Sequence, residues 1–402
     1  MYQCDIDNAE TRRQLFEFIE NSREEMLAFW EDLVNHEGRY DEVAPLVDTA
    51  NFLKRAFEKE GFKCQLADAG DGFAPVLTGV LGEDRPSRPV MFTGHYDTVF
   101  KKGTFGDAPF KIEDGKAYGP GVLDMKGGIA ISLFCAKALN YIGFDALPIK
   151  IAFAGDEEGD RTVAPNSTVQ ILSDYAKGVL FAFNMETGVA DGGVCIGRKG
   201  SADYTVSVKG VASHPGNAFA NGMNAIEETA HKIIEIQQLT PKDYGYTVSV
   251  DTIEGGVASN AIPDFCKIKI DTRANTQKDA AHIRESLEKI CAKTYIDGTS
   301  TELTLDGTFP PYETTDGVLA LYEHIVYTAK KYSLDIPSKN HLGGASDASR
   351  IGAVGVPVLC SYGVPGAGNH TGSEYALVEG FFERTKLLCA SILEADGFPD
   401  GK

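Results

Sequence analysis

Apolar residues follow two different spacings along the first 200 positions, and these spacings predict alternating helices and strands. Spacing of three and four residues predicts helix from about Ala9 to Val34, from Ala50 to Lys59 and over Gly127–Tyr141. Short apolar runs bounded by loop residues are typical of buried strands. We expect such strands at Pro89–Thr93, Ile149–Ala154, Gly178–Phe183 and Val356–Ser361. Strands that alternate with helices indicate a mainly parallel sheet with both faces covered.

The pattern changes between Arg198 and about Pro310. Strands are expected there at Ala202–Lys209, Tyr246–Ile253, Phe265–Asp271 and Thr301–Leu305, and helices at Asn224–Gln238 and Lys278–Ala292. The resulting order, β-α-β-β-α-β, is the ferredoxin-like arrangement. We therefore predict an α/β protein with a discontinuous catalytic domain, residues 1–197 and 311–402, and an inserted α+β domain, residues 198–310. A length of 402 residues also favours two domains.

Composition narrows the classes of protein to which the chain can belong. The chain is 43% hydrophobic and 24% charged, which is typical of a soluble globular protein. Its 38 basic and 58 acidic residues give a net charge of -20, which argues against nucleic-acid and anionic-membrane partners. The N-terminus shows no signal-peptide pattern, and no apolar run reaches the length of a membrane helix. The eight cysteines include no CxxC pair, so we interpret them as reduced residues of a cytoplasmic protein.

Side chains that can bind metals follow the predicted strands. Ligand sites on open parallel sheets lie beyond the carboxyl ends of the strands. The residues found at these ends are His95, Asp97, Asp156, Glu157, Glu158, Glu186 and His370, and Asp124 opens the helix that begins at Gly127. Five separate segments thus bring imidazole or carboxylate groups to one predicted edge of the sheet.

Imidazole and carboxylate together are the usual ligands of zinc, manganese or cobalt in hydrolases. Two histidines and three ligating carboxylates suit two ions about 3.5–4 Å apart. We expect Asp124 to bridge the ions, because its loop starts the long helix and can sit between the other four ligands. His95 and Glu186 would complete one metal site, and Glu158 and His370 the other. Zinc is the expected ion, and cobalt or manganese are alternatives.

Two further carboxylates have expected roles beside the metals. Glu157 adjoins a ligand and is the predicted general base. Asp97 can accept the second ring N–H of His95 and fix the tautomer of that ligand. Each residue alone has an ordinary interpretation, such as a loop histidine, a solvated acidic run or, for Asp124, a helix cap. Their joint occurrence at five segments favours a metal centre.

These residues lie in segments that resemble peptidase family M20, the dinuclear zinc aminoacylases and carboxypeptidases. The matching segments, in family order, are TGHYDTV (93–99), GPGVLDMKGG (119–128), DEEGD (156–160), METG (185–188) and GNHTGSEY (368–375). The resemblance implies the same metal roles, including a bridging Asp124 and a basic Glu157. Glu186, where some members have aspartate, resembles the peptidase and carboxypeptidase branches. The glutamate pair is followed by GDRTVAP in place of the small residues of many members.

The inserted domain also resembles this family. The segment KGVASHPG (209–216) implies that His214 reaches the active site of a partner subunit and stabilises the tetrahedral oxyanion, so a homodimer through the inserted domain is expected. The segments GGVASNAIPD (255–264) and DTR (271–273) imply that Asn260 contacts polar groups of the substrate and that Arg273 pairs with its α-carboxylate. The ordinary alternatives are a surface-loop histidine for His214 and a structural ion pair for Arg273.

The sequence therefore predicts a metal-dependent exopeptidase, most like the glutamate-carboxypeptidase branch. Its substrate would be a small peptide or N-acyl amino acid with a free carboxylate, attacked by a metal-bound hydroxide with Glu157 as base. An N-acyl-amino-acid deacylase or desuccinylase is the alternative with the same machinery. A metal- or peptide-binding protein without catalysis is the alternative of another class, and the presence of Glu157 argues against it.

Overall fold

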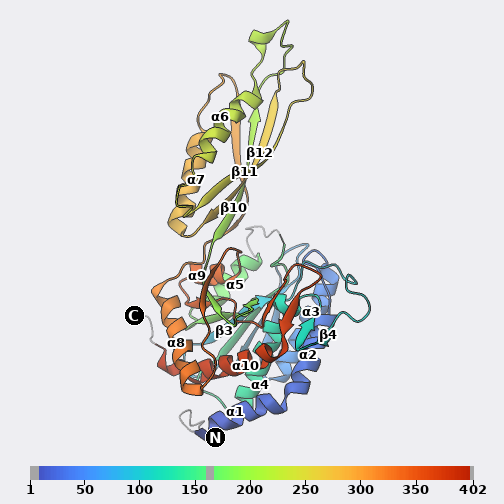
Figure 1. Cartoon of the computed structure of the whole chain (residues 1–402), viewed down its shortest axis with the longest axis vertical. Coiled ribbons are helices and arrows are strands. Elements are labelled where there is room, and N and C mark those ends of the chain that lie inside the picture. Colours follow the sequence, from blue (N-terminus) through green and yellow to red (C-terminus); the bar gives the residue numbers. More distant parts are fainter. Residues whose placement is uncertain (1–8, 160–166, 399–402) are drawn as a thin grey trace. The chain divides into compact units, whose positions relative to one another are not determined.

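The computed structural model describes residues 9–159 and 167–398 (Figure 1). Cys4, Asp160 and the rest of the segment that follows the glutamate pair lie outside the described residues. The chain forms two compact units. The first unit comprises Met1–Gly197, Thr314–Leu342 and Ser346–Lys402, and the second comprises Arg198–Glu313 and Gly343–Ala345.

A six-stranded sheet forms the centre of the first unit, in the order β1-β2-β6-β3-β7-β15. Its strands are β1 (Lys63–Ala67), β2 (Val76–Leu81), β3 (Val90–His95), β6 (Ile149–Ala154), β7 (Ala182–Asn184) and β15 (Val358–Leu359). Strands β6, β3, β7 and β15 are parallel, whereas β1 and β2 pair antiparallel. This mixed, mainly parallel sheet confirms the predicted fold class. The observed β7 and β15 are shorter than the apolar runs that predicted them.

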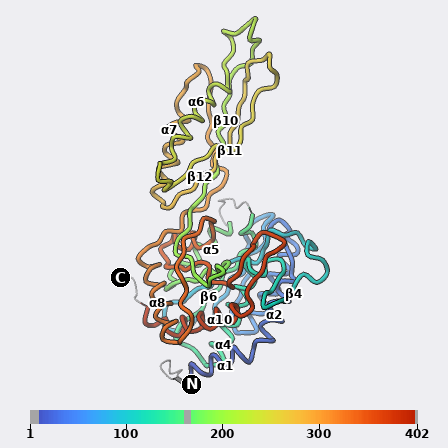
Figure 2. The backbone as a smooth tube through the Cα atoms, in the orientation of Figure 1, coloured from blue at the N-terminus to red at the C-terminus, as the bar shows by residue number. Residues whose placement is uncertain are grey.

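Helices cover this sheet. They are α1 (Ala9–Asn21), α2 (Arg23–Asn35), α3 (Val43–Lys59), α4 (Gly127–Tyr141), α5 (Thr168–Ala176), α8 (Asp316–Tyr332), α9 (Ala348–Ala353) and α10 (Val378–Leu393). The single helix expected from Ala9 to Val34 is wrong in one respect, because the chain breaks at Ser22 between α1 and α2. Helix α4 is apolar on nearly all sides, which is typical of a buried helix, and it lies beside α10 (Figure 2). Among the described helices, none is long and apolar enough to cross a membrane.

A second, smaller sheet of the first unit joins segments that are far apart in the sequence. Its order is β4 (Lys111–Glu113), β5 (Lys116–Tyr118), β17 (Tyr375–Leu377), β16 (Pro365–Ala367) and β8 (Gly188–Val189). In the antiparallel pair of β17 and β5, Tyr375 lies opposite Tyr118. Strand β5 leads into the short helical turn η1 (Val122–Lys126), so this pairing brings the C-terminal region next to η1. Strands β9 (Val194–Arg198) and β14 (Lys339–Leu342) form a separate pair, and the turn η3 (Ala395–Gly397) follows α10.

The second unit has the predicted β-α-β-β-α-β order. Its elements are β10 (Gly200–Lys209), η2 (Phe219–Asn221), α6 (Ala225–Gln237), β11 (Thr247–Gly255), β12 (Phe265–Ala274), α7 (Gln277–Cys291) and β13 (Ser300–Phe309). The four strands form an antiparallel sheet in the order β11-β12-β10-β13, which is the ferredoxin-like arrangement. Both helices pack on this sheet over a core that includes Val206, Ile268 and Leu287 (Figure 1).

A buried ion pair fixes the end of α7 in the second unit. Glu228 and Lys232, one turn apart on α6, are both fully buried, with 3.0 Å between Oε1 and Nζ. The Lys232 ammonium donates to the backbone carbonyls of Ile290 and Lys293. The other oxygen of Glu228 accepts the N–H groups of Tyr295 and Ile296, at 2.8 and 2.7 Å. The ion pair therefore supplies hydrogen-bond partners for backbone groups at the end of α7 and in the segment that follows it.

Candidate metal centre

Three adjacent parallel strands place the first candidate ligands at one edge of the sheet. In the register, His95 at the end of β3 lies opposite Ala154 at the end of β6, and Thr93 lies opposite Asn184 at the end of β7. The residues that follow β6 and β7 therefore emerge beside His95. This is the edge at which open parallel sheets bind their ligands.

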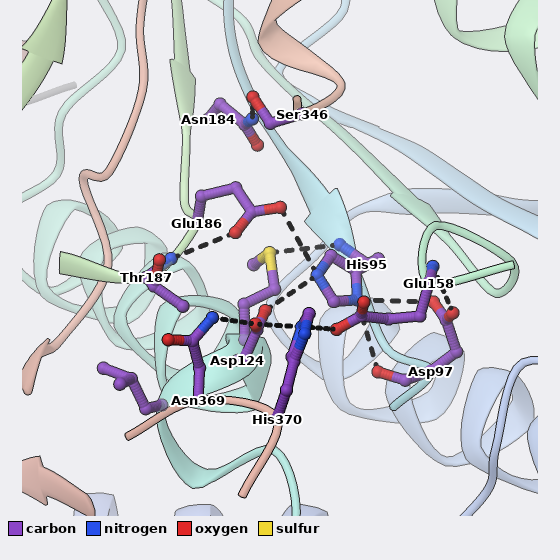
Figure 3. Close-up of polar contacts among 12 residues, drawn as sticks. His95, Asp97, Asp124, Glu158, Asn184, Glu186, Thr187, Ser346, Asn369 and His370 are labelled. Carbon is purple, nitrogen blue, oxygen red and sulfur yellow. Dashed lines mark hydrogen bonds and ion pairs between the residues drawn. The ribbon is translucent and has the colours of Figure 1, made fainter. Parts of the chain in front are cut away.

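His95, Asp124 and Glu186 form one group of converging side chains, here called the His95 group (Figure 3). His95 Nε2 lies 3.2 Å from Asp124 Oδ1 and 3.4 Å from Glu186 Oε1. Ligand atoms about 2.0–2.1 Å from a tetrahedral zinc ion are about 3.3 Å apart. All three residues are buried. The spacing and chemistry of these donors therefore fit a single divalent ion.

Asp124, Glu158 and His370 form a second group, the His370 group. His370 Nε2 lies 3.0 Å from Glu158 Oε1 and 3.2 Å from Asp124 Oδ2. Asp124 thus directs Oδ1 to the His95 group and Oδ2 to the His370 group (Figure 3). Asn369 also donates from Nδ2 to Asp124 Oδ2, at 3.2 Å. A carboxylate that belongs to both groups through different oxygens has the arrangement that a bridging ligand requires.

Asp97 links His95, at the end of β3, to Glu158, which follows β6. One carboxylate oxygen lies 3.3 Å from His95 Nδ1, and the other accepts the backbone N–H of Glu158 at 3.0 Å. The backbone carbonyl of Asp97 lies 3.2 Å from the same ring nitrogen. These contacts orient His95 so that Nε2 faces Asp124 and Glu186. Glu157 is half-buried and forms a further possible ligand group with His95 and Glu158.

In the metal-free protein, each of the two histidines lies against carboxylates that change its pKa. Burial alone would lower the pKa of His95, but its contacts with Asp124, Asp97 and Glu186 raise that pKa well above the ordinary value. Contacts with Asp124 and Glu158 raise the pKa of His370 to about 10. Burial opposes ionisation of Asp124, yet the two histidines hold its pKa below the usual range. Protonated imidazoles therefore supply, in the metal-free protein, the positive charge that this carboxylate cluster requires.

Glu374 is a buried acidic residue that sequence reasoning missed, although it lies in the segment GSEY. It is 1% exposed, and Oε1 accepts the backbone N–H groups of Leu123 and Asp124 at 2.8 and 3.0 Å. Among the residues that the structure describes, Oε2 has no hydrogen-bond partner. Burial raises the pKa of Glu374 to about 8. A glutamate between a glycine-rich loop and a short strand has no periodic pattern that distinguishes it from a surface residue.

Sequence reasoning also missed the contacts of Met125 and Lys126, the two residues that follow Asp124. Lys126 is fully buried and donates from Nζ to the backbone carbonyl of His36 at 3.0 Å, and burial lowers its pKa to about 8. The peptide bond between Asp124 and Met125 is cis. Met125 Sδ lies 3.1 Å from the backbone N–H of His95, and a Cβ at Gly94 would lie only 2.2 Å from that sulfur. Residue 94 must therefore be glycine if Met125 is to keep this position.

The three remaining predicted site residues, His214, Asn260 and Arg273, belong to the second unit. His214 is exposed, and Nδ1 accepts the backbone N–H groups of Gly216 and Asn217, both at 3.1 Å. A neutral imidazole that accepts at Nδ1 carries its proton on Nε2. Asn260 lies in an exposed turn.

Arg273 forms a bidentate pair with Asp271 in the structure. Its Nε and Nη2 donate to the two carboxylate oxygens at 3.0 and 2.7 Å. This contact is the ordinary ion pair that the sequence left open as the alternative. Arg273 remains 39% exposed, so part of its guanidinium is accessible to a further anion.

Comparison with known proteins gives a consistent result. The family model described as Peptidase family M20/M25/M40 matches residues 91–394, a range that includes every residue of the two metal groups. Carboxypeptidase G2 of Pseudomonas sp. strain RS-16 is 26% identical over 392 residues, 94% of this chain and 91% of the relative. Succinyl-diaminopimelate desuccinylase of Rickettsia akari is 27% identical over 273 residues, 62% of this chain and 70% of the relative. The solved structure of aminopeptidase PepT from Bacillus cereus has a TM-score of 0.75 at 22% identity and covers 93% of this chain and 99% of its own.

Proposed function

The chain belongs to peptidase family M20/M25/M40 and is a metallo-hydrolase of that family, and we propose that it acts as a carboxypeptidase-like exopeptidase. Its substrate would be a small peptide or N-acyl amino acid that ends in a free carboxylate. One observation carries the proposal: Asp124 directs one oxygen to the His95 group and the other to the His370 group. That arrangement supports a centre for two ions.

We assign one ion to His95, Asp124 and Glu186 and a second to Asp124, Glu158 and His370. Oxygen and imidazole donors suit zinc, and they also accept cobalt or manganese. When bound, two such ions would polarise the scissile carbonyl and make a coordinated water more acidic.

Glu157 is the proposed general base. It adjoins the ligand Glu158, and its carboxylate approaches the same group of donors as His95 and Glu158. From this position it would accept a proton from the attacking water and return it to the leaving amine. Asp97 would act by holding the ring of His95 through Nδ1.

Recognition of the substrate is proposed for the domain at residues 198–310, which would act as lid and dimerisation domain. His214 would donate from Nε2 to the developing oxyanion of a partner subunit, and its hydrogen bonds to Gly216 and Asn217 support that tautomer. Arg273 would bind the substrate carboxylate while Asp271 holds one side of the guanidinium. Asn260 would contact other polar groups of the substrate.

A deacylase or desuccinylase with the same machinery is the second candidate. The observation that favours it is the match over 62% of this chain to succinyl-diaminopimelate desuccinylase. Both candidates use the same metal centre and differ in the acyl side of the bond that they cleave.

A panel of matched substrates separates the candidates. The metal-reconstituted protein is assayed against dipeptides, N-acetyl and N-succinyl amino acids, and the C-terminal amides of the same compounds. We expect cleavage of the dipeptides and loss of cleavage on amidation. Preference for N-acetyl or N-succinyl amino acids supports the deacylase, whereas equal cleavage of the amides contradicts recognition of a free carboxylate. Uptake of ions without any turnover would indicate a binding protein.

A further inference from the structure

We propose that Glu374 is a positioning residue that fixes the shared ligand Asp124 by binding the backbone N–H groups of Leu123 and Asp124. The inference rests on the proposed two-metal function. It assigns to Glu374 no contact with substrate and no metal ion, so its effect would act through the placement of Asp124.

The hydrogen bonds of Glu374 explain how it would act. Its Oε1 accepts two consecutive N–H groups, from Leu123 at 2.8 Å and from Asp124 at 3.0 Å. Successive backbone N–H groups in a turn form a concave site for a negative charge. An acceptor there fixes the backbone on the N-terminal side of the Asp124 Cα. The carboxylate of Asp124 is only two side-chain dihedral angles away from that fixed backbone.

Asp124 has less freedom of position than a terminal ligand. Its Oδ1 must face His95 Nε2 and its Oδ2 must face His370 Nε2, both at 3.2 Å. Functional groups need placement within about 0.5 Å to work as a set. A small shift of the backbone at Asp124 would therefore disturb both groups, whereas a shift of Glu158 or Glu186 would disturb one.

The same loop that holds Glu374 also carries His370. Glu374 directly precedes β17, in which Tyr375 pairs with Tyr118 of β5. Its N–H donates to the carbonyl of Thr371, next to His370, at 3.2 Å. Glu374 therefore connects the backbone of one ligand loop to the backbone of the other. This connection keeps His370 and Asp124 in register as β17 and β5 pair.

The burial of Glu374 argues against a role in which its side chain contacts water or substrate. The side chain is 1% exposed, so it is shielded from bulk water. Burying a carboxyl group costs free energy unless hydrogen bonds compensate for the lost water. The compensation here comes from the backbone of the residues that aim Asp124, and the second oxygen has no partner among the described residues. The hydrogen bonds of the Glu374 carboxylate therefore stabilise the backbone of η1.

Metal binding tests the proposal without substrate. The variants are Glu374→Ala, Glu374→Asp and Glu374→Gln in the full chain, and the probe is cobalt, measured by chelator competition and by its visible absorption spectrum. We expect Glu374→Ala to weaken the affinity for at least one ion by about 10–100-fold, as is usual for groups that support metal ligands, and to change the spectrum. Glu374→Gln keeps an acceptor oxygen at the same reach and should bind both ions with less than a tenfold loss.

Glu374→Asp keeps the charge but is one methylene shorter, so it should bind more weakly than Glu374→Gln. This pair decides the question if Glu374→Ala does not fold. The matched control is Glu228→Ala, which removes another buried glutamate that accepts two backbone N–H groups, those of Tyr295 and Ile296, in the second unit. The control should lower stability and leave cobalt affinity unchanged.

Two results would overturn the proposal. One is unchanged affinity and spectrum in Glu374→Ala or Glu374→Asp, and the other is a loss in Glu374→Gln as large as in Glu374→Ala. A parent protein that binds two ions but cleaves no substrate refutes the proposed exopeptidase activity, while the comparison of variants still decides the role of Glu374. A parent that binds fewer than two ions overturns both.

Discussion

In the metal-free protein, we expect His370 to keep its proton far above the pH at which histidine usually loses it. The perturbation is removal of metal with a chelator, followed by a pH titration. Asp124 Oδ2 and Glu158 Oε1 lie 3.2 and 3.0 Å from His370 Nε2, and these carboxylates raise the pKa of the imidazole to about 10. With that pKa, about 99% of His370 is protonated at pH 8, compared with about 3% for an ordinary histidine.

The assay is NMR of protein labelled with ¹⁵N-histidine, recorded between pH 5 and pH 10. His324 is an internal reference, since burial lowers its pKa and its midpoint should lie on the other side of the ordinary value. Glu158→Gln removes one of the two carboxylate partners, so the midpoint of His370 should fall in that variant. A midpoint of His370 near 6.5 in the metal-free parent would refute the reasoning about these contacts.

The sign of the effect on stability follows from the same shift. The folded metal-free protein binds the proton of His370 more tightly than the unfolded chain does. This contribution to stability is therefore complete below about pH 6.5 and is lost as the pH rises toward about 10. Metal binding has the opposite dependence, because an ion must displace the proton. Over this range, metal affinity should increase with pH.

Three further predictions concern single residues. Glu157→Gln should retain both ions and lose about 10²–10⁴-fold in kcat. A loss of metal in this variant, measured by elemental analysis, would instead assign Glu157 to the metal ligands. Arg273→Lys should lower kcat/KM about 10–100-fold for substrates with a free carboxylate, because a charge-assisted hydrogen bond contributes about 1.5–3 kcal/mol; an equal loss with amidated substrates would indicate that Arg273 acts only through Asp271. Glu228→Leu leaves Lys232 buried without its partner and should lower the free energy of unfolding by about 3–5 kcal/mol in denaturant titrations. A change within 1 kcal/mol would contradict the account of that pair.

The sequence predicted several elements with strong apolar patterns, but it missed the mostly buried strand β2 and the helices α5, α8, α9 and α10. The runs ending at Thr93 and Ala154 became β3 and β6, and the alternating pattern of the second unit gave all four of its strands. Strand β1 was missed because its residues alternate only between exposed and half-buried positions. The break at Ser22 was missed because the apolar spacing continues through it.

The candidate site was predictable to the extent that its residues follow strands. His95 is the last residue of β3, Glu158 and Glu186 follow the ends of β6 and β7 closely, and the topology brings such residues to one edge. The role of Glu374 depends on the turn of the backbone at Leu123, which no spacing of apolar residues encodes. The pairing of Arg273 with Asp271 likewise depends on side-chain orientation, so the sequence left both interpretations open.

The discontinuity of the first unit sets an order of events during synthesis on the ribosome. His370 follows Glu186 by 184 residues, and the whole second unit, including Gly343–Ala345, lies between them. At about 5–20 residues per second, a growing chain would wait about 10–40 s for its last ligand. The second unit is nearly continuous and can complete its sheet during this delay. A nascent chain thus cannot complete the proposed metal centre until residue 370 has been synthesised.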